Sequence, residues 1–186
     1  MRYTTKDALA DALKALLEQK PLHNITVNDI AERCGVTRQT FYYHFEDVYD
    51  LLRWIFERES ERIVAGNRTA ATWQQGLADL MTYARENRRL VMNAYRSVGR
   101  EHLERFFSDI VDGFLSAVLD EEAQGIVLCD QDRAFIILYH RCAFQGLLLG
   151  WVGAGMREEP EELVSRLSKL IEGDFARAVR RFAAPE

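Results

Sequence analysis

The fold of this chain is decided by residues 26–45, Thr26-Val-Asn-Asp-Ile-Ala-Glu-Arg-Cys-Gly-Val-Thr-Arg-Gln-Thr-Phe-Tyr-Tyr-His-Phe45. Thr26 is followed three residues later by an aspartate, which is the spacing of a helix capping box with Asp in place of Glu. Thr37 marks a second helix start, and Gly35 lies before it, where the chain must turn sharply. Two short helices joined by a glycine turn predict a helix-turn-helix motif, whose second helix lies in the DNA major groove.

The predicted second helix carries no carboxylate, although the whole chain has a net charge of −5. Any contact with DNA must therefore be made by a local patch rather than by the whole surface. Each side chain on its exposed face can donate a hydrogen bond to a phosphate or a base edge, given a suitable histidine tautomer. These side chains are Thr37, Arg38, Gln39, Thr40, Tyr42, Tyr43 and His44. The alternative interpretation is an ordinary solvated helix pair with a cluster of tyrosines.

The sequence contains no pattern typical of a catalytic or metal site. Gly-x-Ser-x-Gly, a phosphate-binding glycine loop and His-Glu-x-x-His are all absent, so we expect no enzyme. The three cysteines show no close paired spacing of the kind that indicates zinc or a disulfide framework. A metal trio of Cys129, His140 and Cys142 can be drawn, but a small buried residue is the ordinary explanation for a cysteine in an apolar helix. We therefore expect no cofactor and no metal.

The chain also lacks the sequence features of export and membrane insertion. It begins Met-Arg-Tyr-Thr-Thr without an apolar leader, and no uninterrupted apolar run approaches the ~20 residues of a spanning helix. With 186 residues, 48% of them hydrophobic, the chain can bury a substantial core. We expect a soluble, cytoplasmic protein that makes no membrane contact.

Helical spacing of apolar residues continues along the whole chain, and no alternating pattern is long enough to demand a strand. The predicted fold is all-α, with about nine helices. Residues 1–47 are expected to form the helix-turn-helix domain, and a fourth helix at 47–65 links that domain to the body. Residues 48–186 are expected to form a helical ligand-binding and dimerisation domain, which ends in one helix from Pro160 to Arg181.

Residues 8–52 resemble the DNA-binding domain of the TetR family of transcriptional regulators. The resemblance rests on Thr26-x-x-x-Ile-Ala, on Gly35-Val-Thr and above all on Thr40-Phe-Tyr-Tyr-His-Phe. The last of these patterns is quite specific to the family in this setting. The resemblance implies a DNA-binding regulator whose second motif helix reads the operator.

The resemblance also implies a role for each position of the motif. Base edges would be faced by Arg38, Gln39 and Thr40, phosphates would be bound by Tyr42 and His44, and Tyr43 would do either. At the preceding helix start, Thr26 and Asn28 would contact the DNA backbone, with one base within reach. Family members commonly carry a phosphate-binding lysine where this chain has Val48. We therefore expect weaker non-specific DNA binding than in a typical relative, with specificity intact.

The predicted helix from Asp130 to Val152 is apolar on more than one face, and such a helix is usually buried all round. Gly146 and Gly150 lie four residues apart, which allows another helix to approach closely. We expect this helix and the last one to pair with their copies in a second subunit. The predicted interface residues are Gly146, Leu147, Gly150 and Trp151. Such a homodimer would place two reader helices roughly 34–36 Å apart on a near-palindromic DNA operator.

The stretch from Gly146 to Leu163 resembles the C-terminal region of TetR-type regulators related to dihydroxyacetone-kinase regulators. This resemblance also implies a dimer, and in the family the second domain often encloses a small-molecule pocket. The candidate lining residues are Tyr95, His102, Phe106, Phe135, Tyr139 and His140. Core packing is the alternative for each of them, and for His102 a solvated surface position. We expect a repressor; the alternative is an activator or co-regulator that a partner protein controls instead of a small-molecule effector.

Overall fold

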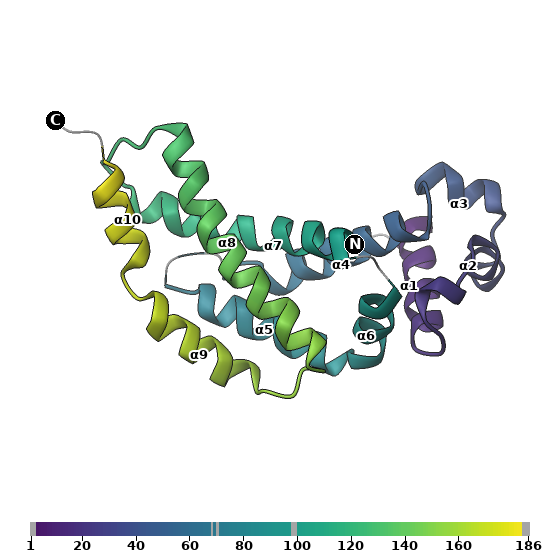
Figure 1. Cartoon of the computed structure of the whole chain (residues 1–186). Coiled ribbons are helices and arrows are strands. Elements are labelled where there is room, and N and C mark those ends of the chain that lie inside the picture. The colour runs from purple at the N-terminus through teal and green to yellow at the C-terminus, as the bar shows by residue number, and fades with distance from the viewer. Residues whose placement is uncertain (1–2, 68, 70, 98–99, 184–186) are drawn as a thin grey trace. The chain divides into compact units, whose positions relative to one another are not determined.

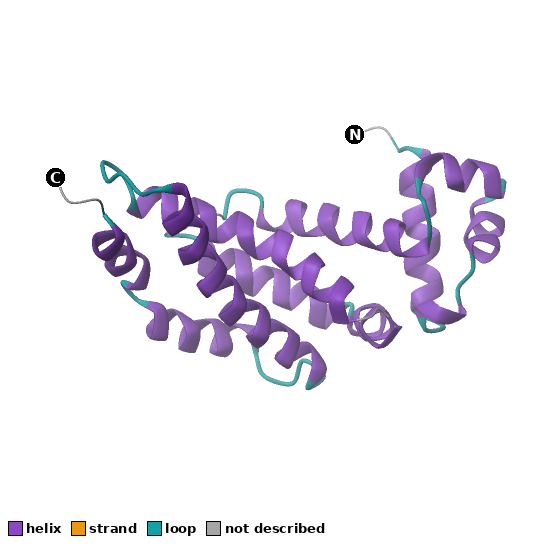
Figure 2. Cartoon of the chain, turned by 45° about the horizontal axis from the view of Figure 1, so that its top comes forward, coloured by secondary structure: helices purple, strands orange, loops and turns teal. Residues whose placement is uncertain are grey.

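The computed structural model describes residues 3–67, 69, 71–97 and 100–183, and it leaves out the side chains of residues 100–107, 109 and 110. The described residues form helices and loops only (Figure 1), and Figure 2 shows no strand among them, which confirms the all-α fold. The elements are α1 (Thr5–Leu17), the short 3-10 helix η1 (Leu22–Asn24), α2 (Val27–Cys34), α3 (Arg38–His44), α4 (Val48–Val64), α5 (Trp73–Glu86), α6 (Arg88–Ser97), α7 (Arg100–Glu122), α8 (Asp130–Gly153), α9 (Pro160–Ile171) and α10 (Asp174–Phe182).

Side-chain caps set the starts of the first three helices. Thr4 and Thr26 each form a capping box, in which the threonine side chain accepts the backbone N–H of an aspartate three residues on. Thr37 caps α3 by accepting the backbone N–H of Thr40. Gly35 ends α2 with φ of 69°, a left-handed conformation that glycine adopts without the strain of a Cβ. The predicted helix-turn-helix is therefore present, with the predicted caps.

Contacts divide the chain into two compact units. The N-terminal unit comprises residues 1–59 and 84–106, and the C-terminal unit comprises residues 60–83 and 107–186. Helices α4, α5 and α7 therefore contribute residues to both units.

The N-terminal unit holds the helix-turn-helix on a small apolar core, to which α6 also contributes. Phe41 of α3 and Ile30 of α2 are completely buried in this core, together with Leu90 of α6. The amide of Asn93 donates a 2.7 Å hydrogen bond to the carbonyl of Leu17, which fixes α6 against the end of α1. Two ion pairs, Arg58 with Asp7 and Lys14 with Glu59, join α1 to α4. The reader helix is thus anchored through Phe41 in a core to which α1, α2, α4 and α6 also contribute.

The C-terminal unit packs α5, α7, α8, α9 and α10 around a second core. Its buried side chains include Leu77, Met81, Phe114, Leu115, Leu119, Phe144, Leu148, Leu167 and Val179. Gly76 marks a close approach in this unit, because a Cβ there would lie 2.6 Å from the carbonyl oxygen of Asn67. The absence of a side chain at Gly76 is therefore required by packing.

The last predicted helix, from Pro160 to Arg181, is two helices in the structure. Gly173 interrupts it with φ of 72°, and α10 begins at the next residue. A single helix cannot continue through a left-handed residue, so the chain bends between α9 and α10. The sequence did not indicate this break, because apolar residues recur at helical spacing on both sides of Gly173.

Candidate nucleic-acid interface

Helix α3 turns one apolar side chain inward and its polar side chains outward. Phe41 is fully buried, while the residues before and after it on the helix surface are exposed or half-buried. The hydroxyl groups of Thr37 and Thr40 lie 2.9 Å apart, so the start of the helix is held together by side chains as well as by the cap. The seven residues of this segment that are predicted to contact DNA are exposed or half-buried: Thr37, Arg38, Gln39, Thr40, Tyr42, Tyr43 and His44.

Arg38 and Tyr42 interact with each other one helical turn apart. The guanidinium Nη2 of Arg38 donates to the hydroxyl of Tyr42 at 3.4 Å, and its central carbon lies 5.9 Å from the ring centroid. This contact restricts the arginine while leaving its remaining donors free to bind an acceptor. Tyr43 is 84% exposed, and its ring contacts that of His44 edge-on at 5.0 Å.

The start of α2 presents Thr26 and Asn28, both exposed, as predicted for backbone contacts. The Thr26 hydroxyl already bonds to Asp29 at 2.9 Å, and Lys20 pairs with the same carboxylate at 3.1 Å. The backbone N–H of Thr26 contributes most to lowering the pKa of Asp29, followed by the threonine hydroxyl and Lys20. The carboxylate therefore stays ionised, with an adjacent cation to balance it.

The segment after α3 has the acidic character that the sequence indicated. Asp47 accepts the backbone N–H of Asp50 at 2.8 Å, and Val48 is buried in the core of the N-terminal unit. Lys6 contributes a cation beside this segment, because its ammonium group lies 5.2 Å from the Phe45 ring centroid and 5.8 Å from that of Trp54. This contact joins the start of α1 to the end of α3, and only the spatial proximity of residues distant in sequence reveals it.

Helix α8 carries a second exposed surface, of the opposite chemical character. We call it the α8 stripe, and it consists of Phe135, Leu138, Tyr139, Cys142, Gly146, Leu147 and Gly150, all exposed. A Cβ placed at Gly146 or Gly150 meets no other side chain or distant backbone within 4 Å. Three of the four predicted interface residues therefore lie on this surface. Trp151 does not, because it is 5% exposed and its indole N–H donates to the carbonyl of Glu158 at 2.9 Å.

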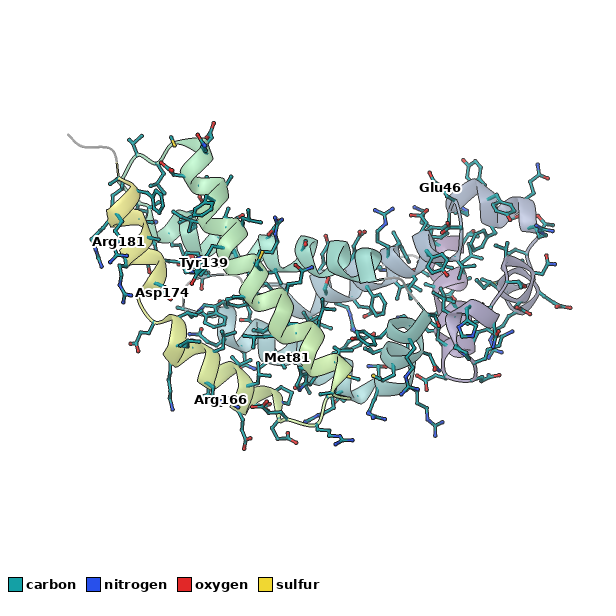
Figure 3. The ribbon with its side chains drawn as sticks, in the orientation of Figure 1. Glu46, Met81, Tyr139, Arg166, Asp174 and Arg181 are labelled. Carbon is teal, nitrogen blue, oxygen red and sulfur yellow. The ribbon has the colours of Figure 1, made fainter. Side chains whose placement is uncertain are left out.

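The structure does not bring together the side chains of the predicted effector pocket that it describes. Phe135 and Tyr139 are on the exposed α8 stripe, where Figure 3 labels Tyr139, and Tyr95 belongs to the N-terminal unit. His140 is buried and stacks on Phe175 of α10, with ring centroids 4.0 Å apart. The side chains of His102 and Phe106 lie outside the described residues. The sequence could not distinguish the exposed Phe135 and Tyr139 from the buried His140, because an apolar helix does not reveal which of its faces is turned inward.

A cavity of about 320 Å³ lies elsewhere in the C-terminal unit, between α5, α7, α8 and the bend that joins α9 to α10. Its apolar wall includes Trp73, Phe114, Phe144 and Phe175. Its polar wall includes Gln74 and Ser168, whose side chains are hydrogen-bonded at 3.3 Å. None of the six predicted pocket residues lines this cavity among the side chains that the structure describes.

Two family profiles match this chain. Residues 9–54 match the tetR family of bacterial regulatory proteins, and residues 71–173 match a transcriptional regulator C-terminal region. A curated relative, the HTH-type dhaKLM operon transcriptional activator DhaS of Lactococcus lactis, is 30% identical over 75% of this chain and 74% of its own length. The chain belongs to the TetR family of transcriptional regulators. It is therefore a DNA-binding regulator and not an enzyme, as predicted.

Solved structures of TetR regulators agree with this assignment. The dihydroxyacetone kinase operon activator DhaS superposes with a TM-score of 0.68 and 25% identity, covering 97% of this chain and 98% of that one. The TetR family repressor AlkX from Dietzia sp. has the same fold, with a TM-score of 0.61 and 18% identity over 96% of this chain and 99% of that one. Membership of the TetR family implies operator DNA binding and dimerisation. The individual contact residues remain predictions.

Helix α8 is long and apolar enough to span a membrane when judged by length and composition alone, although the sequence predicts no membrane contact. The core helix of a soluble protein meets the same criteria, and a third of the apolar window of α8 is buried inside this chain. In a TetR regulator, dimerisation offers a different explanation for the exposed remainder. Its apolar residues are those of the α8 stripe.

Proposed function

We propose that this TetR regulator reads a near-palindromic operator as a homodimer, with α3 of each subunit in the major groove. The observation that carries this proposal is the outward face of α3, which combines exposure with hydrogen-bond donors and contains no carboxylate. In the proposed arrangement, Arg38, Gln39 and Thr40 read base edges, and Tyr42 and His44 bind phosphates. Tyr43 makes either contact, while Thr26 and Asn28 hold the backbone at the start of α2.

The α8 stripe is the proposed dimer interface. A helical glycine lowers stability by about 1 kcal/mol relative to alanine, so two exposed helical glycines are a disadvantage for an isolated chain. Gly146 and Gly150 have empty space beside them, which a helix of a second copy can fill. A closed two-fold pair would cover the apolar side chains of both subunits and place the two reader helices on one side of the operator.

We further propose that residues 1–47 recognise DNA, and that α4 links them to a regulatory and dimerisation part in residues 48–186. Both parts would act in the cytoplasm, where operator DNA is accessible. The matched family profiles support this division, since one ends at residue 54 and the other begins at residue 71.

Repression is the direction of control that we first expected, and activation is the second candidate. The Lactococcus relative is named a transcriptional activator, and its similarity over three quarters of this chain favours activation. An activator of this kind could be controlled by a partner protein instead of a small effector. A promoter reporter carrying the selected operator decides the direction: co-expression of the chain lowers the signal of a repressed promoter and raises that of an activated one.

Selection of random DNA duplexes by the purified chain tests the proposal. We expect an enriched inverted repeat whose half-site centres lie about one helical turn, or a multiple of it, apart. Repeating the selection with Arg38→Ala should relax the preference at the same base in both half-sites. Arg180→Ala, an exposed arginine on α10, is the control and should select the wild-type site. Enrichment of isolated half-sites, or of no site, would contradict the proposal.

A further inference from the structure

We propose that the cavity between α5, α7, α8 and the α9–α10 bend binds a small organic ammonium ion. This inference adds a site and a ligand chemistry to the proposed regulator. It rests on the proposed function only for the effect of the ligand on DNA binding. The site differs from the one that the sequence suggested, and it depends on Gly173, which turns the chain so that Phe175 of α10 faces the same space as residues of α9.

The apolar side of the cavity is aromatic and firmly held. Trp73 and Phe144 contact each other edge-on, with centroids 5.7 Å apart and planes at 62°. The ring of Phe175 is stacked on the ring of His140, at an interplanar angle of 18°. Aromatic rings attract a cation that approaches within about 6 Å of their centres, and rings fixed by their neighbours lose little freedom when a ligand binds.

The rim of the cavity carries more negative than positive charge. Glu122 and Glu172 contribute carboxylates, and Lys169 contributes one ammonium group. None of the three forms an ion pair with another side chain that the structure describes. With two carboxylates and one ammonium group, the rim has a net negative charge. It therefore attracts a cationic ligand and repels an anionic one.

The size and the polar wall limit the ligand further. A volume of about 320 Å³ is at the small end of ligand sites, so it suits one ring or a short branched chain with its amine. Gln74 and Ser168 can offer both hydrogen-bond donors and acceptors, of which an ammonium group uses the acceptors. We therefore expect the amine near the rim and the apolar body against the aromatic wall.

Three probes with the same ring and different charges test this chemistry: benzylamine, benzyl alcohol and benzoate. Isothermal titration calorimetry of the full chain at pH 7 should show benzylamine binding with a Kd of about 1 mM or lower. Benzyl alcohol should bind about tenfold more weakly, and benzoate should not bind at the concentrations used. An equal or tighter affinity for benzyl alcohol or benzoate, or no binding of benzylamine, would overturn the proposal.

Paired variants locate the binding site. Ser168→Leu fills the cavity from α9 and should weaken benzylamine binding at least about tenfold, whereas Ser165→Leu, exposed on the same helix, should not. Glu172→Gln should weaken benzylamine binding about threefold to tenfold while changing benzyl alcohol little; Glu161→Gln is its control. Binding that survives Ser168→Leu would place benzylamine elsewhere. If Ser168→Leu melts below the temperature of the titration, the charge pair Glu172→Gln and Glu161→Gln decides.

DNA binding is then measured separately, so that the two proposals can fail independently. Wild-type protein that selects no operator refutes the proposed function, while its benzylamine titration still tests the cavity. Wild-type protein that binds its operator should change its operator affinity at least about threefold in saturating benzylamine, and the Ser165→Leu control should do the same. An operator affinity that saturating benzylamine leaves unchanged would refute the regulatory role of the site.

Discussion

The exposed face of α3 and the α8 stripe differ in polarity. The outward face of α3 is polar, free of carboxylate and rich in hydrogen-bond donors. The α8 stripe is apolar, interrupted by glycines, and has no donor on it except the Tyr139 hydroxyl and the Cys142 thiol. Both surfaces stay exposed among the described residues, although the Phe135 ring of the α8 stripe lies 6.4 Å from the Phe182 ring of α10. The comparison indicates two different partners, a polyanion for α3 and an apolar surface for α8.

This difference indicates that the side chains on an exposed face must match the chemistry of the partner that binds there. A surface that binds DNA must keep its donors solvated and ready, because phosphate and base contacts replace water contacts one by one. A surface that binds another apolar helix needs shape and close approach, which small residues allow. Each of the following experiments removes one of these features from one surface and asks whether the other surface is affected.

The largest effect is expected from a charge in the α8 stripe. Gly146→Asp would bury an unpaired carboxylate in the proposed interface, which typically destabilises an association by about 3–5 kcal/mol. We expect a monomer at micromolar concentration in sedimentation velocity, and loss of operator binding with it. Gly113→Asp, an exposed helical glycine on α7 with no other atom within 4 Å of its Cβ position, is the control and should remain dimeric. A Gly146→Asp protein that still dimerises would move the interface away from the stripe.

A pair of alanine substitutions calibrates the glycine argument. Gly76→Ala places a methyl group 2.6 Å from the carbonyl oxygen of Asn67 and 3.0 Å from a ring carbon of Phe114, so we expect a loss of about 1–3 kcal/mol in urea unfolding. Gly113→Ala, with open space, should instead gain about 0.5–1 kcal/mol. Gly146→Ala should behave like Gly113→Ala if solvent surrounds it and should weaken the dimer if a second helix does. Stabilisation of all three variants would invalidate the inference from glycine spacing.

The α3 surface is tested by removal of its arginine. Arg38→Ala should lower the affinity for the selected operator by about 1–3 kcal/mol and the affinity for random DNA much less, because a bidentate contact to guanine is lost. Fluorescence anisotropy with both duplexes at one salt concentration measures the two losses. The variant should remain a dimer, which separates the two surfaces. Equal losses on both duplexes would reassign Arg38 to a phosphate.

The sequence predicted the α3 surface far better than the α8 stripe, and the reason is the range of the interactions. Caps such as Thr26 and Thr37, and the turn at Gly35, depend on residues three or four positions away, so the local sequence contains the whole interaction. The inward direction of Phe41 follows from helical spacing once those caps are known. The residues predicted to contact DNA from α3 are accordingly exposed or half-buried, and their contacts with DNA stay a prediction.

In α8 the local sequence does not determine which apolar side chains are buried and which are exposed. Trp151 and Phe135 are both large and apolar, yet the first is buried in its own chain and the second is exposed. Trp151 donates its indole N–H to the carbonyl of Glu158 in the turn before α9, whereas the ring of Phe135 lies 6.4 Å from that of Phe182 in α10, beyond the break at Gly173. The cavity at this bend could not be predicted, because its wall combines residues of five helices.

A smaller effect is expected at the phosphate contacts of α3. His44→Ala should weaken binding to the operator and to random DNA alike, by about 1 kcal/mol, and reduce the slope of log affinity against log salt by no more than one. Titrations of both duplexes at several salt concentrations give the slope. His23→Ala, an exposed histidine of η1, is the control and should preserve it. A loss confined to the operator would make His44 a base reader.

The smallest effect concerns the carboxylate that lies next to the predicted backbone contacts. The pKa of Asp29 is lowered in the folded state, chiefly by the Thr26 backbone N–H, so the unfolded chain binds a proton at a higher pH than the folded chain does. The resulting stabilisation is present above the ordinary aspartate pKa and is lost as the pH falls through the lowered value.

Thermal melts of Asp29→Asn test this dependence. The decrease in Tm on acidification from about pH 5 to about pH 2, a range that includes the ordinary aspartate pKa, should be smaller for Asp29→Asn than for wild type. Glu32→Gln, exposed on the same helix, is the control; if it flattens the profile as much as Asp29→Asn does, the cap at Thr26 is not the source of the pH dependence. Because Asp29→Asn adds no charge to α3, the preference for the selected operator over random DNA should persist at pH 7.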